Sequence, residues 1–297
     1  MDLRRFIPFL AMPVLLVVVE ICALALSLPV KEAGISAFED PQSVANPFIF
    51  IAILLLFTGF LLLLIKFGKK WVVSAAIWIS IFLTFIYIFS AIVFTALGAT
   101  DAATVLMLAL SLGATLLLYR FPEWYVIDVL GVFIASGVAS IFGVSLGILP
   151  VVILLILLAV YDAISVYKTK HMITLAEGVI DLKTPILFVI PKKKDYSFIR
   201  EGVGKLEEGG ERAAFIMGMG DLIMPSILVV SANVFLAGPR LLGLVTIPAL
   251  GAVIGSLAGL VVLLRFVSSG RPQAGLPPLN GGTLLGFFIG WALIGFA

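Results

Sequence analysis

Residues 149–162 read LPVVILLILLAVYD, an apolar run that ends on Tyr161 and Asp162. A second acidic residue, Asp221, follows the tripeptide GMG at 218–220 and precedes another apolar stretch. An ionisable group at membrane depth costs about 2.5–3.5 kcal/mol on insertion scales, so it marks a candidate functional site whose partner should be sought. Each aspartate is the natural partner of the other, and we expect the fold to bring them together.

The composition of this 297-residue chain is that of a polytopic membrane protein. It is 62% hydrophobic and 12% charged, whereas soluble domains are about 45–50% apolar and about 25% charged. The net charge of +2 gives no reason to expect a nucleic-acid partner. The chain has one cysteine, Cys22, and one histidine, His171. A zinc site built from His and Cys ligands is therefore disfavoured, and we expect no metal and no cofactor.

Apolar segments of roughly 20 residues, long enough to cross a bilayer, recur nine times along the chain. We therefore expect an all-α polytopic membrane protein with a single domain over 1–297. One long hydrophilic loop, 169–211, separates the sixth and seventh spans, and the apolar run at 185–191 inside it favours a short strand. The expected spans lie near residues 6–29, 46–65, 71–97, 102–119, 124–147, 150–168, 212–236, 241–264 and 279–297.

Basic residues predict how the bundle is oriented. With a cytoplasmic N-terminus, the inner side holds most of them, including Arg4, Arg5 and every Lys and Arg of the 169–211 loop. The outer loops then hold only Lys31 and Arg240. This asymmetry predicts an N-in, C-out topology. We expect a multi-pass integral protein of the cell membrane, in contact with the lipid bilayer.

The two aspartates suit hydrolysis. Asp162 lies near the inner end of the sixth span and Asp221 about nine residues into the seventh, so antiparallel packing would place them at similar depth. Two nearby carboxylates in a poorly solvated site do not both ionise readily, so one holds a proton. The ionised group can take a proton from water while the other donates to a carbonyl oxygen. Gly218 and Gly220 would let a substrate backbone approach closely.

Three motifs, in this order, resemble those of the presenilin and signal peptide peptidase family of intramembrane aspartyl proteases. They are Tyr161-Asp162, Gly218-Met219-Gly220-Asp221 and Leu276-Pro277-Pro278-Leu279. The third departs from the Pro-Ala-Leu motif of the family by a proline in place of alanine. The chain looks closest to archaeal presenilin homologues. The resemblance implies a presenilin-like bundle with catalytic Asp162 and Asp221. It also implies a group of substrate-binding residues: Tyr161, Gly218, Gly220, Leu276, Pro277, Pro278 and Leu279.

The resemblance also implies an activity. It is that of an aspartic endopeptidase of the GxGD type, which hydrolyses peptide bonds within the transmembrane helices of single-span membrane-protein substrates. The predicted orientation is that of presenilin, so these substrates would have cytoplasmic C-termini. The sequence leaves open whether the protein forms a homo-oligomer and whether it needs accessory subunits. Because a helical substrate must unwind before water attacks it, we expect the 185–191 strand to pair with the unwound segment.

Other functions stay open at this point. A proton- or cation-coupled secondary transporter also uses intramembrane carboxylates and broken helices, although an odd number of spans argues against paired halves. A prepilin-peptidase-like enzyme and a non-catalytic scaffold are further alternatives. The GVSLG sequence at 143–147 fits a serine-hydrolase motif, but that motif needs a strand-to-helix turn and a histidine base. Glu20 and Asp128 are expected to make structural hydrogen bonds or to tune the site.

Overall fold

Apolar helices make up most of the structure. The computed structural model describes residues 7–68, 70–168, 187–193, 195–202, 214–267 and 273–295. Within these ranges, eight helices are long and apolar enough to cross a membrane. They are α1 (Ile7–Glu32), α2 (Asn46–Lys66), α3 (Lys70–Leu97), α4 (Asp101–Arg120), α5 (Trp124–Ser145), α6 (Ile148–Tyr167), α10 (Ile247–Val267) and α11 (Leu276–Gly295).

The seventh expected span differs from its prediction over 212–236. Helix α9 covers only Met219–Phe235, and strand β2 (Ala214–Gly218) takes the place of its first turns. Glycine disfavours a helix interior, and Gly218 and Gly220 fall at this junction, where a second strand offers the backbone another partner. Asp221 therefore lies in the first turn of α9. With 17 residues, α9 is about 26 Å long at 1.5 Å per residue.

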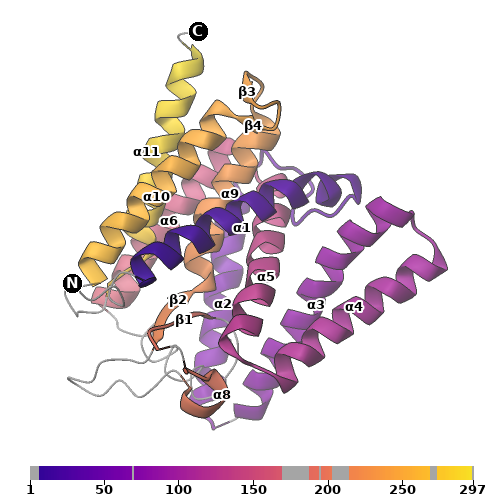
Figure 1. The fold of residues 1–297 in the computed structure, drawn as a ribbon. Helices are drawn as coiled ribbons and strands as arrows, with labels where there is room; N and C mark the ends of the chain where they lie inside the picture. Colours follow the sequence, from indigo (N-terminus) through magenta and orange to yellow (C-terminus); the bar gives the residue numbers. More distant parts are fainter. Residues whose placement is uncertain are drawn as a thin grey trace.

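Two strands flank α9 on its N-terminal side. Strand β1 (Leu187–Pro191) pairs antiparallel with β2, so that Val189 is opposite Ile216. The predicted strand is confirmed over 187–191, and Pro185 lies outside the described residues. A one-turn helix, α8 (Phe198–Glu201), lies at the same end of the molecule, and the small hairpin β3–β4 (Arg240–Leu241, Val245–Thr246) lies at the other (Figure 1).

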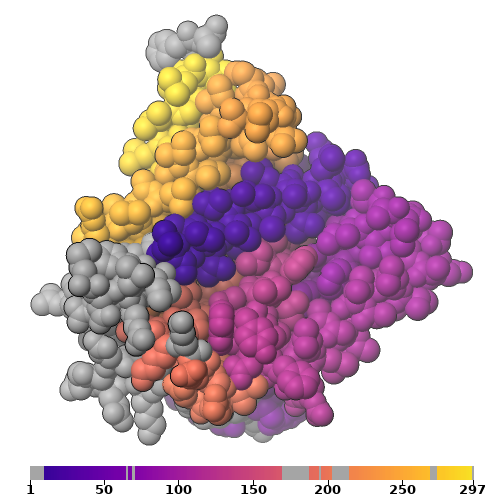
Figure 2. Space-filling model, in the orientation of Figure 1, coloured from indigo at the N-terminus to yellow at the C-terminus, as the bar shows by residue number. Residues whose placement is uncertain are grey.

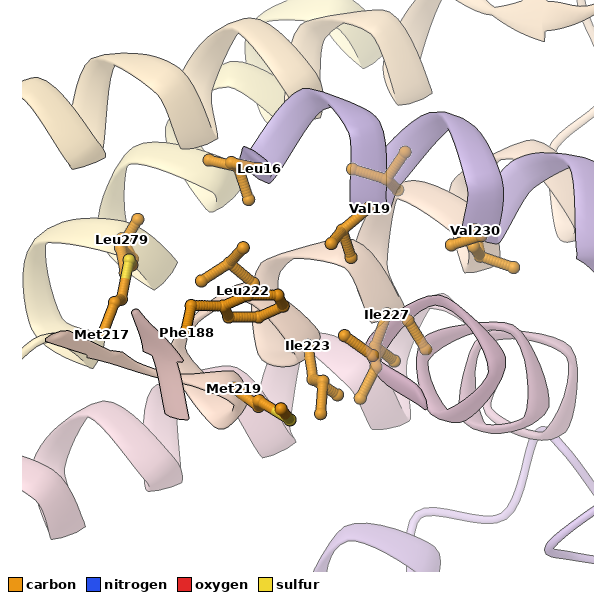
Figure 3. Packing of buried hydrophobic residues seen from close by; sticks show 14 of the residues in the cluster. Leu16, Val19, Phe188, Met217, Met219, Leu222, Ile223, Ile227, Val230 and Leu279 are labelled. Atoms are coloured by element: carbon orange, nitrogen blue, oxygen red, sulfur yellow. The ribbon is translucent and has the colours of Figure 1, made fainter. Parts of the chain in front are cut away.

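The core lies where α1, α5, α9 and the β1–β2 hairpin meet. Figure 3 shows Leu16 of α1, Phe188 of β1 and Leu222 of α9 gathered in one cluster, all of them fully buried. Ser140 on α5 donates a hydrogen bond to the Ala23 carbonyl on α1 at 2.6 Å. Helices α3 and α4 form a hairpin that projects to one side of this core (Figures 1 and 2).

Helices α10 and α11 touch along a seam of glycines, as their four-residue spacing predicts. A Cβ added at Gly255 would collide with the Gly282 carbonyl, and one added at Gly259 would collide with the Pro278 carbonyl. The two backbones are therefore in direct contact. This contact fixes where α11 begins, and the first residues of α11 lie beside Asp162.

Candidate active site

Asp162 lies in the C-terminal half of α6 and is buried, with 8% of its surface exposed. Its Oδ2 accepts a hydrogen bond of 3.0 Å from the backbone N–H of Leu276, the first residue of α11. The backbone of Gly275 lies within hydrogen-bonding reach of the same carboxyl group. The start of α11 is therefore anchored to Asp162.

Asp221 approaches the same stretch of backbone from α9. It is half-buried and lies in the first turn of that helix, where the partial positive charge of the helix N-terminus favours a carboxylate. A Cβ added at Gly275 would lie 3.0 Å from both of its carboxyl oxygens, and the charge of Asp162 acts on it. The fold thus brings Asp162 and Asp221 to one two-residue stretch, Gly275–Leu276.

The predicted site residues on α6 and α9 lie around this pair. Tyr161 is half-buried and lies near Thr58 on α2. Gly218 precedes the first turn of α9, and a Cβ there would lie 3.4 Å from Asp221 Oδ2. A Cβ at Gly220 would meet no described atom within 4 Å. The space beside Gly220 is therefore open on the described part of the chain.

The four-residue segment 276–279 forms the first turn of α11. Proline is tolerated there because the first N–H groups of a helix have no intrahelical acceptor, which is how Pro277 and Pro278 fit. Leu279 is fully buried in the core, whereas Leu276, Pro277 and Pro278 are half-buried. The proline that replaces the family alanine therefore leaves the helical start of α11 intact.

Two residues beside the pair were not predicted. Gly275 lies against both aspartates. The only feature of the sequence that could have pointed to a role in the site is its position directly before Leu276. Tyr167, at the end of α6, donates a hydrogen bond of 2.8 Å to Gln273 Oε1 and accepts one of 3.2 Å from the Ala274 N–H. Helix α6 therefore holds the 273–276 segment at two points.

Glu20 on α1 and Asp128 on α5 both make hydrogen bonds, as expected. Glu20 Oε1 accepts from the Ser256 hydroxyl at 2.7 Å, and Asp128 Oδ1 accepts from the Val189 N–H at 2.8 Å. Within the described ranges, no group of three or more His, Cys, Asp or Glu side chains is arranged to hold a metal ion.

The serine-hydrolase alternative does not fit the local structure. Ser145 is the last residue of α5, where it accepts a hydrogen bond from the Ala37 N–H at 2.7 Å and donates one to the Ile141 carbonyl. The segment connects two helices, whereas the motif needs a strand-to-helix turn. His171 lies outside the described residues.

The fold and the site together define a polytopic helical membrane protein with a paired-carboxyl site. The family model described as signal-peptide peptidase, presenilin aspartyl protease matches residues 13–296. The chain belongs to this family, which confirms the resemblance of its motifs.

Solved structures agree with the family match. Two crystal forms, C222 and P2, of a presenilin family intramembrane aspartate protease are each 51% identical to this chain. The match to the C222 structure covers 96% of this chain and 99% of the chain in that structure, with a TM-score of 0.73. The match to the P2 structure covers 96% of this chain and 98% of the chain in that structure, with a TM-score of 0.71. None of the curated proteins matches. The chain is an intramembrane aspartyl endopeptidase, and no comparison supports the transporter alternative.

Proposed function

We propose that Asp162 and Asp221 are the catalytic pair, and that they hydrolyse peptide bonds within the transmembrane helices of single-span membrane proteins. One observation carries this proposal: both carboxyl groups converge on the Gly275–Leu276 backbone. The Leu276 N–H already donates to Asp162, so this carboxyl group accepts a hydrogen bond from a peptide backbone. Tyr161, Gly218, Gly220 and the 276–279 segment would line the path of that peptide.

The chemistry follows from two carboxyl groups that share one proton. The ionised group takes a proton from water, whose oxygen attacks the scissile carbonyl carbon, while the protonated group gives its proton to the carbonyl oxygen. A gem-diol forms. The carboxyl group that is now protonated gives its proton to the amide nitrogen, and the one that is now ionised takes a proton from a gem-diol hydroxyl. The C–N bond breaks, and a carboxylic acid and an amine leave. The pair again holds one proton and acts as a unit throughout.

The proposed topology counts α9 as a ninth span, with the N-terminus inside and the C-terminus outside in the cell membrane. Lys66 ends α2 and Arg265 lies in the last turn of α10, both on the side proposed to be cytoplasmic. Arg240 lies in β3 on the opposite side. This distribution supports the positive-inside orientation.

The substrate class can be tested directly. The purified protein, in detergent, is given a single-span membrane protein, and products are identified by mass spectrometry. We expect two fragments whose new ends lie within the apolar span and differ in mass from the substrate by one water. New ends found only in the loops outside the span would contradict the proposal.

An unwound substrate needs a partner for its backbone, and the β1–β2 hairpin offers one edge. Val189 of β1 donates its N–H to Asp128 on α5, away from β2. In an antiparallel ladder, opposite residues alternate between hydrogen-bonded and non-hydrogen-bonded pairs. Val189 and Ile216 therefore form a non-hydrogen-bonded pair, and the N–H of Ile216 points to the far edge of β2.

That far edge leads directly to Asp221. Ile216 and Gly218 are both half-buried and lie two residues apart on β2. Because the hydrogen-bonding direction alternates along a strand, the N–H and C=O groups of both residues point away from β1. Strand β1 is covered by α5, with Val189 only 1% exposed. We therefore place the added substrate strand on β2, whereas the sequence alone suggested the 185–191 strand.

Replacing Ile216 by proline tests this strand addition. Proline removes the outward N–H, which the β1–β2 ladder does not use, so the hairpin is expected to persist. We expect kcat/KM for a single-span substrate to fall roughly tenfold, the cost of one backbone hydrogen bond of about 1 kcal/mol or slightly more. Ile216→Val keeps the N–H and should cleave like the parent protein. Equal rates for all three proteins would rule out addition at β2.

A further inference from the structure

Two acidic residues at the N-terminal end of α5 bind described parts of the segment that connects the two aspartate-bearing helices. Asp128 Oδ1 accepts the Val189 N–H of β1 at 2.8 Å. Glu123, directly before α5, accepts from the Ser197 hydroxyl at 2.7 Å through Oε1 and from the Phe198 N–H at 3.0 Å through Oε2. The strand β1 and the short helix α8 are therefore both attached to this end of α5 through carboxyl oxygens that accept hydrogen bonds.

The surface of α5 is also shaped for this contact. A Cβ added at Gly131 would lie 2.8 Å from the Met219 side chain and 3.1 Å from the Phe188 ring. Phe188 belongs to β1, and Met219 begins α9 two residues before Asp221. Figure 3 shows both side chains in the same apolar cluster. One face of α5 thus touches the hairpin and the start of the catalytic helix together.

Among the described residues, Asp128 is the side chain of α5 that accepts a hydrogen bond from the β1 backbone, and this bond lies at the middle of the strand. Tyr196 lies near the same carboxylates and donates to the Gly202 carbonyl at 2.7 Å. Burial, together with the charges of Glu201, Glu123 and Asp128, raises the pKa of Tyr196 to about 12, so this phenol remains a donor. The described parts of the loop, 187–193 and 195–202, are therefore hydrogen-bonded to Asp128 and Glu123.

We propose that Asp128 is a positioning residue that fixes the register of the β1–β2 hairpin on α5, and thereby selects which substrate peptide bond reaches Asp162 and Asp221. The proposal rests on substrate addition at β2. Strand β2 runs without a break into the first turn of α9. The register in which a substrate strand pairs with β2 therefore determines which of its peptide bonds lies beside Asp221. Strand registers that keep the same faces differ by two residues. A hairpin that is held loosely would therefore admit cleavage two residues away from the normal bond.

The test compares Asp128→Ala with Asp128→Asn in the full-length protein. Alanine leaves the Val189 N–H without its acceptor, whereas asparagine keeps a carbonyl oxygen in its place. For Asp128→Ala we expect additional fragment ends offset by two residues and a kcat/KM lowered roughly 10- to 100-fold, as for a small misplacement of the reacting groups. For Asp128→Asn we expect the parent fragment ends. Mass spectrometry of the products measures both.

Ser140→Ala is the matched control for stability. It removes a buried hydrogen bond from the same helix, to α1, without touching the hairpin. We expect it to lower the thermal midpoint and leave the fragment ends unchanged. If Asp128→Ala does not fold, Asp128→Ser, which has a shorter and weaker acceptor, is compared in the same way. The register role is overturned if these variants give only the parent ends, or if Asp128→Asn shifts them as alanine does.

The outcome also separates this inference from the function it rests on. If Ile216→Pro leaves cleavage unchanged, substrate does not add at β2 and the basis of the inference is lost. If Ile216→Pro slows cleavage but Asp128→Ala keeps the parent fragment ends, the substrate adds at β2 and only the role of Asp128 is wrong.

Discussion

Asparagine in place of either Asp162 or Asp221 is expected to lower turnover of a single-span substrate by roughly 10²–10⁴-fold or more, the contribution of a positioned general acid or base. Asparagine cannot exchange a proton with water as a carboxyl group does. At Asp162 it still offers an oxygen to the Leu276 N–H, so the anchor of α11 is retained. Product formation over time, measured by mass spectrometry, reports the loss.

The two carboxyl groups should also behave as one unit. Because groups that act together are strongly non-additive, the double variant is expected to be no slower than either single variant. Asp101→Asn, an equivalent change at the exposed start of α4, should cleave like the parent protein. Thermal midpoints close to the parent value would show that folding is intact. Substantial turnover in either single variant would remove that aspartate from the mechanism.

Hydropathy predicted most of the spans because the bilayer leaves the backbone little choice. A spanning segment must satisfy its own N–H and C=O groups, so a long apolar run forms a helix. The sixth span, expected over 150–168, is Ile148–Tyr167, and the fifth, expected over 124–147, is Trp124–Ser145. The two aspartates were found for the same reason, since an ionisable group in such a run is costly and therefore marks a candidate functional site.

The predicted start of the seventh span was wrong because the structure of residues 214–218 depends on pairing with another strand, which hydropathy does not reveal. Residues 214–218 are apolar enough to continue a helix, yet they pair with β1, which lies more than twenty residues earlier in the chain. The contact of Gly275 with both aspartates was missed for a similar reason. The position of Gly275 follows from the packing of α11 on α10 through facing glycines. The glycine spacing in the sequence predicts that these helices pack closely, but not which residues the packing brings next to the aspartates.

Valine in place of Gly275 is expected to produce the second large loss of activity. A Cβ at this position would lie 3.0 Å from both carboxyl oxygens of Asp221, tighter than an ordinary carbon–oxygen contact, and the valine methyl groups would extend further. The aspartate must move away or the 273–276 segment must shift from Asp162. Because a misplacement of about 1 Å can cost about 10²-fold in rate, we expect kcat to fall by about that factor.

Gly281→Val is the matched control, since a Cβ at Gly281 on α11 would meet no described atom within 4 Å. It introduces the same side chain within α11, close to the position of Gly275 in the chain, and should leave kcat near the parent value. Gly275→Ala is expected to fall between the two, because its single methyl group needs a smaller displacement. The three rates, measured with one substrate in one detergent, should therefore decrease as the volume added beside Asp221 increases. A Gly275→Val enzyme as fast as Gly281→Val would mean that the aspartates do not meet at this backbone during catalysis.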